Sequence, residues 1–197
     1  MPGTIAKFDP HVFGPTISGI LAGAPPMSLD AGAPNSDVGR RLRELKAGDL
    51  FAGEPVNDPD MAEACLSALW LRHGFLDESH TLSQGIHTPT GSYWHGLMHR
   101  SEGDYPNAKY WFRRVGNHPV FAGLSVAARE IAALGDGPAA RTMAAQDSWD
   151  PYYFIDMCEI AVGAGKPDDL LWCQVQRAEW EILFAYCYHG AMQGIGL

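Results

Sequence analysis

The sequence has few of the features that identify common protein classes. No apolar run is long enough to span a bilayer, and no charged start followed by an apolar stretch marks a signal peptide. Cysteine is sparse and forms no C-x-x-C pair, so Cys65, Cys158, Cys173 and Cys187 are expected to be reduced core thiols of a cytoplasmic protein. Basic residues are scarce too: 14 Lys and Arg stand against 23 Asp and Glu, which argues against nucleic-acid binding.

Complete catalytic motifs are missing as well. The chain contains no Gly-x-Ser-x-Gly elbow, no glycine-rich phosphate loop and no His-Glu-x-x-His metalloprotease pattern. The sequence therefore fixes neither a reaction nor a substrate, and it leaves the assembly state open, homo-oligomers included.

The chain does contain enough apolar sequence to form one sizeable core. Its 197 residues are 46% hydrophobic and include six tryptophans. Apolar residues recur at helical spacing, no strand-hairpin signal is present, and Asp58-Pro59 and Asp150-Pro151 are strong helix starts. We predict an all-α fold of six to eight helices in antiparallel pairs.

The first 35 residues differ from the rest because eleven of them are Pro or Gly. We predict a non-helical arm over residues 1–35 and a single helical domain over residues 36–197. The predicted helices cover 37–47, 58–73, 91–101, 105–115, 119–134, 151–162 and 167–189. Residues 77–90 are expected to form a polar connection with at most one helical turn, at 79–84.

The region from Ser92 to His118 is the most unusual part of the chain and is predicted to be a helical hairpin. Between His95 and His118 there are four basic side chains and two acidic ones, which leaves 10 basic and 21 acidic residues elsewhere. A basic hairpin on an acidic body suits a small anionic ligand better than a polyanion. The alternative is that acids of neighbouring helices neutralise this face.

The first site hypothesis is a divalent metal. His95 and His99 are spaced i, i+4, so both imidazoles lie on one helix face, and Glu102 extends that face by another turn. His80 or Glu78, from the preceding polar connection, would complete a set of three or four ligands and leave a position for water. The alternative is that the two histidines have a structural or surface role.

The second site hypothesis is a metal-free pocket with hydrolytic or isomerising chemistry. His95 or His99 would act as general acid/base, tuned by Glu179, which the helical wheel of residues 167–189 places between two apolar stripes together with Glu181. A buried glutamate must find a donor or take up a proton, and the candidate donors are Arg100, Arg113, Arg114, His95 and His99. The pocket wall would be formed by Trp94, Tyr110 and Trp111. The anion would be bound by the basic side chains of the hairpin, Arg100, Lys109, Arg113 and Arg114.

Two local resemblances add a third hypothesis. The stretch LWLRHGFLDESHTLSQ…TPTGSYWHGLMHRSEGDYPNAKYWFRRVG resembles an uncharacterised family of bacterial all-helical proteins, which implies one structural unit and no named activity. GDYPNAKYWF resembles the second helix of a tetratricopeptide repeat, although no second copy follows at the repeat spacing. That resemblance implies a non-enzymatic interaction module whose basic side chains hold an acidic partner.

Overall fold

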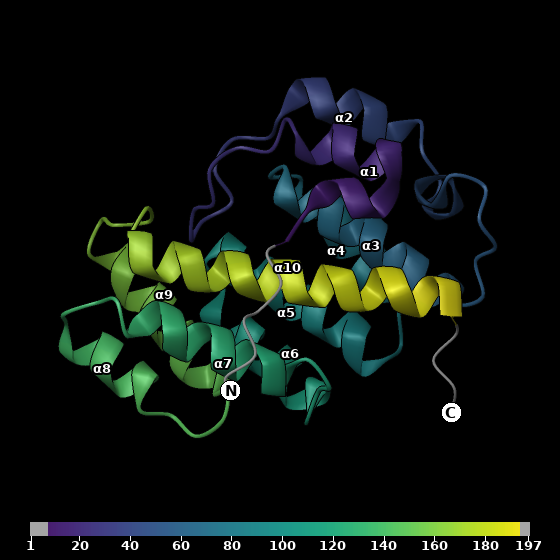
Figure 1. Ribbon diagram of the computed structural model, residues 1–197. Coiled ribbons are helices and arrows are strands. Elements are labelled where there is room, and N and C mark those ends of the chain that lie inside the picture. Colours follow the sequence, from purple (N-terminus) through teal and green to yellow (C-terminus); the bar gives the residue numbers. More distant parts are fainter. Residues whose placement is uncertain (1–7, 194–197) are drawn as a thin grey trace.

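The computed structural model describes residues 8–193 and contains ten α-helices and two 3-10 helices, with no strand among these residues (Figure 1). Residues 1–7 of the predicted arm and 194–197 of the predicted domain lie outside the described residues. The all-α class is therefore confirmed for the described chain. None of its helices has both the length and the apolar character that a bilayer crossing requires.

The elements follow one another in this order: η1 (Pro10–Phe13), α1 (Gly14–Leu21), α2 (Ser36–Arg43), η2 (Ala47–Phe51), α3 (Pro59–Arg72), α4 (Leu76–Gly85), α5 (Pro89–Glu102), α6 (Tyr105–Val115), α7 (Phe121–Ala132), α8 (Pro138–Ala144), α9 (Pro151–Gly163) and α10 (Leu170–Gln193). The helix starts predicted at Asp58 and Asp150 are confirmed. Both carboxylates cap the first turn, Asp58 accepting from Met61 N and Asp150 from Tyr152 N.

The predicted count of six to eight helices was too low, and the arm supplies one reason. Residues 14–21 form α1, although glycine and proline are frequent there. Pro15 lies in the first turn, where its missing N–H costs no hydrogen bond. Ile17 and Ile20 are completely buried, so tertiary packing outweighs the weak helix propensity of the segment.

The other two unpredicted helices are α4 and α8. The polar stretch around Ser79 is a full helix because its small polar residues face inward and are satisfied there: Ser67 Oγ donates to Ser79 O at 3.0 Å. The segment Pro138–Ala144 is short and buries only Ala140 and Met143, so its apolar pattern is weak.

The division of the chain into an N-terminal arm and a helical domain stays a prediction.

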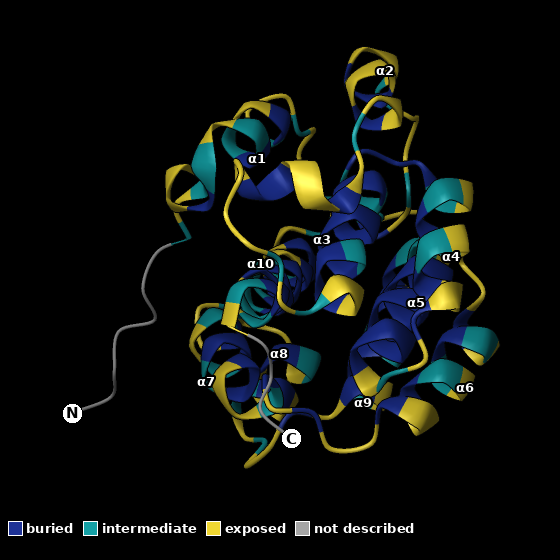
Figure 2. Cartoon of the chain, turned by 90° about the vertical axis from the view of Figure 1, so that its right-hand side faces the viewer, coloured by how far each residue is buried: buried dark blue, intermediate teal, exposed yellow. Residues whose placement is uncertain are grey.

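Two helices occupy the centre of the molecule. The longest, α10, runs across the whole protein and packs against α3 on one side and α7 on the other (Figure 1). α5 contacts α3, α4 and α6, and every residue from Thr90 to Arg100 is buried. Outer helices such as α2 and α6 instead expose one face (Figure 2). Because α5 has neighbours all round, its polar residues must find partners inside the protein.

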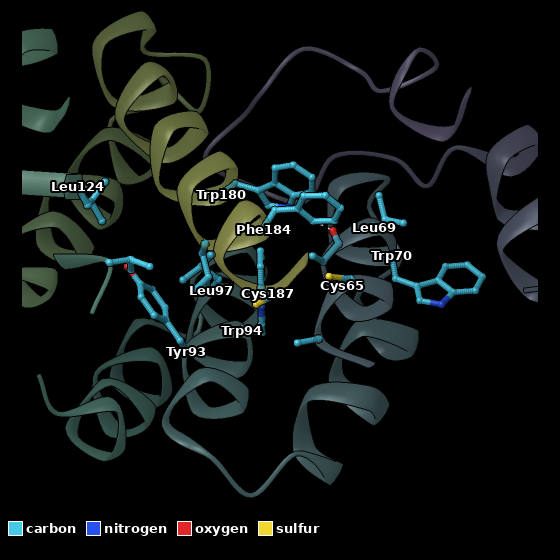
Figure 3. Close-up of a cluster of buried hydrophobic side chains, with 14 of the residues drawn as sticks. Cys65, Leu69, Trp70, Tyr93, Trp94, Leu97, Leu124, Trp180, Phe184 and Cys187 are labelled. Atoms are coloured by element: carbon cyan, nitrogen blue, oxygen red, sulfur yellow. Dashed lines mark hydrogen bonds between the residues drawn. The ribbon is translucent and has the colours of Figure 1, made fainter. Parts of the chain in front are cut away.

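Aromatic side chains fill the space between α10 and α3. Trp180 stacks on Phe184 with ring centroids 4.8 Å apart, and its indole nitrogen donates to Ala68 O at 3.1 Å (Figure 3). Trp94 of α5 points at the same region and donates to Cys187 Sγ at 3.3 Å. The four cysteines are buried and unpaired, which agrees with the expected reduced thiols.

Trp180→Ala should destabilise the protein by about 3 kcal/mol or more, because it removes a buried ring and leaves a cavity. Ile160→Ala on the exposed side of α9 is the control and should cost less than about 0.5 kcal/mol. Urea unfolding followed by circular dichroism measures both. A loss below about 1 kcal/mol for the Trp180 variant would contradict the central position of α10.

Candidate metal centre

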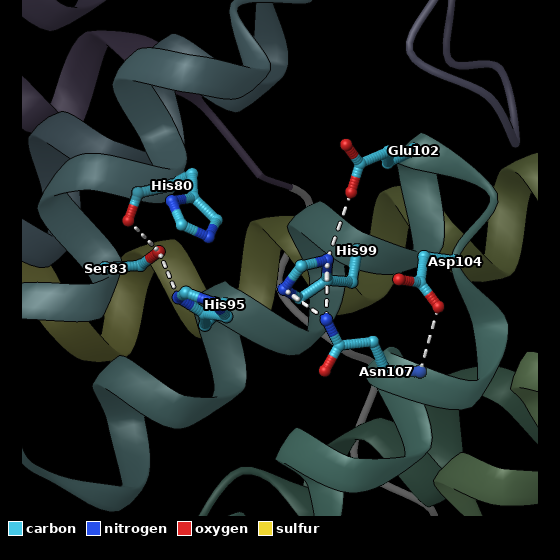
Figure 4. A network of polar contacts seen from close by, with 7 residues as sticks. All are labelled: His80, Ser83, His95, His99, Glu102, Asp104 and Asn107. Atoms are coloured by element: carbon cyan, nitrogen blue, oxygen red, sulfur yellow. Dashed lines mark hydrogen bonds and ion pairs between the residues drawn. The ribbon is translucent and has the colours of Figure 1, made fainter.

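The candidate centre lies where α4 passes over α5. α5 starts at Pro89, where Thr88 accepts from Gly91 N at 3.2 Å, and ends at Gly103, whose φ of 86° suits glycine. Between these ends the i, i+4 spacing puts His95 and His99 on the side that faces α4. His80 of α4 points toward them, so that three imidazoles from two helices face one another (Figure 4).

The three rings are close enough to be considered as one ligand set. One nitrogen from each of His80, His95 and His99 lies within 4.8 Å of the other two. Ring centroids are 4.5 Å apart for His80 and His95 and 4.8 Å apart for His95 and His99. His95 and His99 are buried, whereas His80 is partly exposed and opens the group to solvent.

Ser83 fixes the orientation of His95. Its hydroxyl donates to His80 O at 3.2 Å, so the same oxygen has lone pairs left to accept from the Nδ1–H of His95, also at 3.2 Å. This arrangement places the proton of the neutral ring on Nδ1 and leaves the Nε2 lone pair unused. A lone pair of that kind is what a metal ligand needs.

His99 is oriented by two neighbours of a different kind. Its Nδ1 lies 3.1 Å from Glu102 Oε2, a carboxylate whose side chain is half exposed. Asn107 Nδ2 lies 3.1 Å from His99 Nε2 and donates to it (Figure 4). Glu102 therefore supports the ring, while the amide of Asn107 occupies the lone pair that a metal would use.

Burial keeps His95 uncharged. The pKa of His95 is lowered from 6.5 to about 3, mainly because the ring is desolvated, with smaller contributions from neighbouring His99 and His80. The neutral ring is the form that binds metals. Metal coordination would therefore not have to displace a proton from this histidine at physiological pH.

α6 closes the other side of the centre. Trp111 covers His95 with ring centroids 4.0 Å apart. α6 comes this close because Gly96 has no side chain: a Cβ there would lie 2.9 Å from Phe112 Cδ2. The glutamate that a His-Glu-x-x-His pattern would need at position 96 would collide with α6 here.

Arg100 and Glu179 do not join the histidines. Arg100 lies on another side of α5, 1% exposed, where its Nη2 donates to Glu179 Oε2 of α10 at 2.5 Å. Tyr93 donates to the second carboxylate oxygen at 2.9 Å, and Phe154 stacks on the guanidinium. Burial alone would lower the pKa of Arg100, but the charge and hydrogen bond of Glu179, together with Cys158 and Tyr93, more than offset this, so the pKa is raised. Glu179 is the buried carboxylate that the sequence predicted, and its donor is Arg100, one of the five candidate donors, and not His95 or His99.

The remaining sequence candidates also lie apart from the histidines. Lys109 forms an ion pair with Asp156 of α9, and Trp94 is in the core. Arg113 and Arg114 are exposed on α6, over Tyr110 and Trp111 respectively. The structure brings the predicted metal ligands together but does not gather the predicted anion-binding side chains around them.

Sequence reasoning expected Trp111 in the wall of the histidine pocket, but it did not identify Ser83 or Asn107 as the groups that orient the histidines. Asn107 is separated from His99 by the turn between α5 and α6, and its proximity depends on the angle of that turn. Asp104 capping Asn107 N at 3.1 Å is the local signal that fixes this turn. The helical periodicity of the hairpin alone could not place it.

Glu179→Ala should destabilise the protein by roughly 3–5 kcal/mol, because the charge of Arg100 would be buried without its partner. Glu181→Ala on the same helix removes the surface pair with Arg177, at 2.7 Å, and should cost less than about 1 kcal/mol. Chemical unfolding at pH 7 compares the two. Equal losses in the free energy of unfolding would show that the buried ion pair contributes no more to stability than the exposed one.

The third histidine of the hairpin, His118, gives a prediction about pH. It is buried beside Thr90, 3.1 Å from its hydroxyl, and burial lowers its pKa from 6.5 to about 4. Since the unfolded chain takes up a proton near pH 6.5, the stability from the neutral ring is present above that pH and is lost toward pH 4. His118→Asn should therefore reduce the loss of stability between pH 7 and 5 by on the order of 1 kcal/mol. Unfolding curves at both pH values measure this, and an unchanged loss would contradict it.

No protein-family model, no curated protein and no solved structure matches this chain. The resemblances to a bacterial helical family and to a tetratricopeptide helix therefore stay predictions, as do the expected partners. What the protein does has to be inferred from the positions of its own side chains.

Proposed function

We propose that the protein binds a divalent transition metal, with Zn²⁺ as the first candidate, through His80, His95 and His99. The observation that carries the proposal is the convergence of three imidazole nitrogens, from two helices, within 4.8 Å of one another. Imidazole is a preferred ligand of zinc and its neighbours in the first transition row.

The ligand set needs a small adjustment to close on a metal. Nitrogens that share one zinc ion at 2.0–2.1 Å lie about 3.4 Å apart, so the rings would approach by roughly 1 Å. His80 is partly exposed and has room to rotate. The amide of Asn107 would have to turn away from His99 Nε2, which makes it a competitor for that lone pair.

The residues around the ligands support the same assignment. Metal-bound histidines usually donate their other N–H to a carboxylate, hydroxyl or carbonyl, which fixes the ring. Ser83 fulfils this role for His95, and Glu102 fulfils it for His99. Glu102, expected from the sequence as a direct ligand, fits better as the group that orients His99.

Three protein ligands leave a fourth position for water, as in catalytic zinc sites. Zinc lowers the pKa of such a water to about 7 and makes it a nucleophile at neutral pH. Hydrolysis is therefore the reaction class that we propose for this centre.

Isothermal titration of the chelator-treated protein with ZnCl2 should show one binding site. His80→Ala should weaken binding at least a hundredfold, because two imidazoles of one helix form a much poorer site than three. His99→Ala should weaken it similarly. Titration with CoCl2 followed by visible absorption reports the coordination geometry.

His87→Ala is the matched control, since His87 is exposed in the connection between α4 and α5. It should bind zinc as the wild type does. Circular dichroism must show that the His80 variant stays folded. A wild type that binds no zinc, or a His80 variant that binds it equally well, would overturn the proposed metal centre.

A further inference from the structure

A second cavity lies on another side of α5, and it involves none of the histidines. Its volume is about 110 Å³. The segment from Pro25 to Ala33 forms its roof, and α3, α5 and α10 form its floor. The side chains that matter for its chemistry are Met27, Leu71, Arg72, Leu97, Arg100 and Gln176.

Two backbone hydrogen bonds hold the roof in place, one at its middle and one just after its end. Leu29 N donates to Pro167 O at 2.8 Å, and Asn35 N donates to His73 O at 3.0 Å. Between these points the segment lies close to Gly74, where a Cβ would be 2.9 Å from Ala31 O. The cavity is therefore formed before any ligand arrives, as most small-molecule sites are.

Arg72 lines the cavity, and its guanidinium forms no ion pair with a carboxylate of the described residues. Its guanidinium donates to Pro25 O at 2.6 Å, and no carboxylate of residues 8–193 lies within 4.0 Å of it. Burial lowers its pKa from 12.5 to about 10; Arg177 lowers the pKa further, and Glu181 raises it in part. A partly buried cation of this kind is stabilised by an anion beside it.

Arg100 adds hydrogen-bond donors that lack acceptors. Its Nη2 is bound to Glu179, but within the described chain Nε and Nη1 have no hydrogen-bond partner. The side chain is 1% exposed, so bulk water does not supply the missing acceptors. Unpaired buried donors are costly, and a carboxylate that reaches the inner wall would satisfy them.

Gln176 needs a hydrogen-bond donor, whereas the two arginines need acceptors. Its Nε2 donates to Ser28 O at 2.5 Å, while its Oε1 is buried and has no donor within the described chain. The acidic side chain in the lining, Asp30, is exposed and accepts from Ser28 Oγ at 2.8 Å. The lining therefore needs acceptors at the arginines and a donor at Gln176 and Asp30.

We propose that this cavity binds a small carboxylate that carries a neighbouring hydroxyl or amino group. An apolar cavity of about 150 Å³ holds benzene, so this one suits a molecule of about five or six heavy atoms. The carboxylate lies between Arg72 and Arg100, and its hydroxyl or amino group donates to Gln176. Met27, Leu71 and Leu97 enclose the short carbon chain, which inorganic phosphate lacks.

Ligand-observed NMR and isothermal titration with L-lactate and L-alanine test the proposal. At least one should bind saturably at millimolar concentration or below. Lactamide, which lacks the charge, should bind at least tenfold more weakly than lactate. Propionate, which lacks the donor group, should bind more weakly than the better of the two probes, and the stronger probe tells a hydroxyl from an amino ligand.

Arg72→Gln should weaken binding of the better probe at least tenfold. Arg141→Gln is its control, since Arg141 is an exposed arginine that also donates to a backbone carbonyl, and it should leave binding unchanged. Ala31→Leu should block the cavity without removing a charge. His80→Ala should have no effect, which separates this site from the metal centre.

Several results would overturn the proposal. Saturable binding of neither L-lactate nor L-alanine would show that the cavity holds only water. Equal binding of lactamide would exclude recognition of the charge, and equal binding of propionate would exclude the role given to Gln176. Unchanged binding by both the Arg72 and the Ala31 variants, with thermal unfolding showing that they are folded, would place the ligand elsewhere.

Discussion

The ion pair between Arg100 and Glu179 links the two helices at the centre of the molecule. Both side chains are at most 1% exposed, and Tyr93 and Phe154 complete the surroundings of the pair. Burying two unpaired charges in such a place would cost much free energy. The pair therefore favours the one arrangement of α5 and α10 in which the two side chains meet. Packing of α5 against α3, α4 and α6 holds the helix in the same position and so directs its other side chains.

α5 consequently serves two sites on different sides. His95 and His99 face α4 and form the candidate metal centre, whereas Leu97 and Arg100 face the cavity under the segment from Pro25 to Ala33. The helix can do this because it is buried all round. A helix with one solvent face would leave half of these polar groups in water, where they would have no reason to converge.

The sequence predicted the residues of the metal centre better than their surroundings. The i, i+4 spacing of His95 and His99 guarantees a shared face, because the helix repeat alone fixes it. His80 was expected from a polar connection, and the structure supplies it from a helix instead. Trp111 was expected in the pocket wall, but Asn107 could not be predicted as a neighbour, since the distance between α6 and α5 depends on how closely α6 approaches Gly96.

Capping residues, apolar periodicity and the absence of strand signals were enough to determine an all-helical chain and most of its helix starts. These are local properties, set by hydrogen bonds and side-chain spacing within a few residues. The tertiary structure decided that α1 and α4 are helices, that Glu179 has Arg100 and not a histidine as its partner, and that the segment from Pro25 to Ala33 roofs a cavity. Each of these outcomes depends on burying a group against a partner far away in the chain, and helical periodicity carries no information about which partner that is.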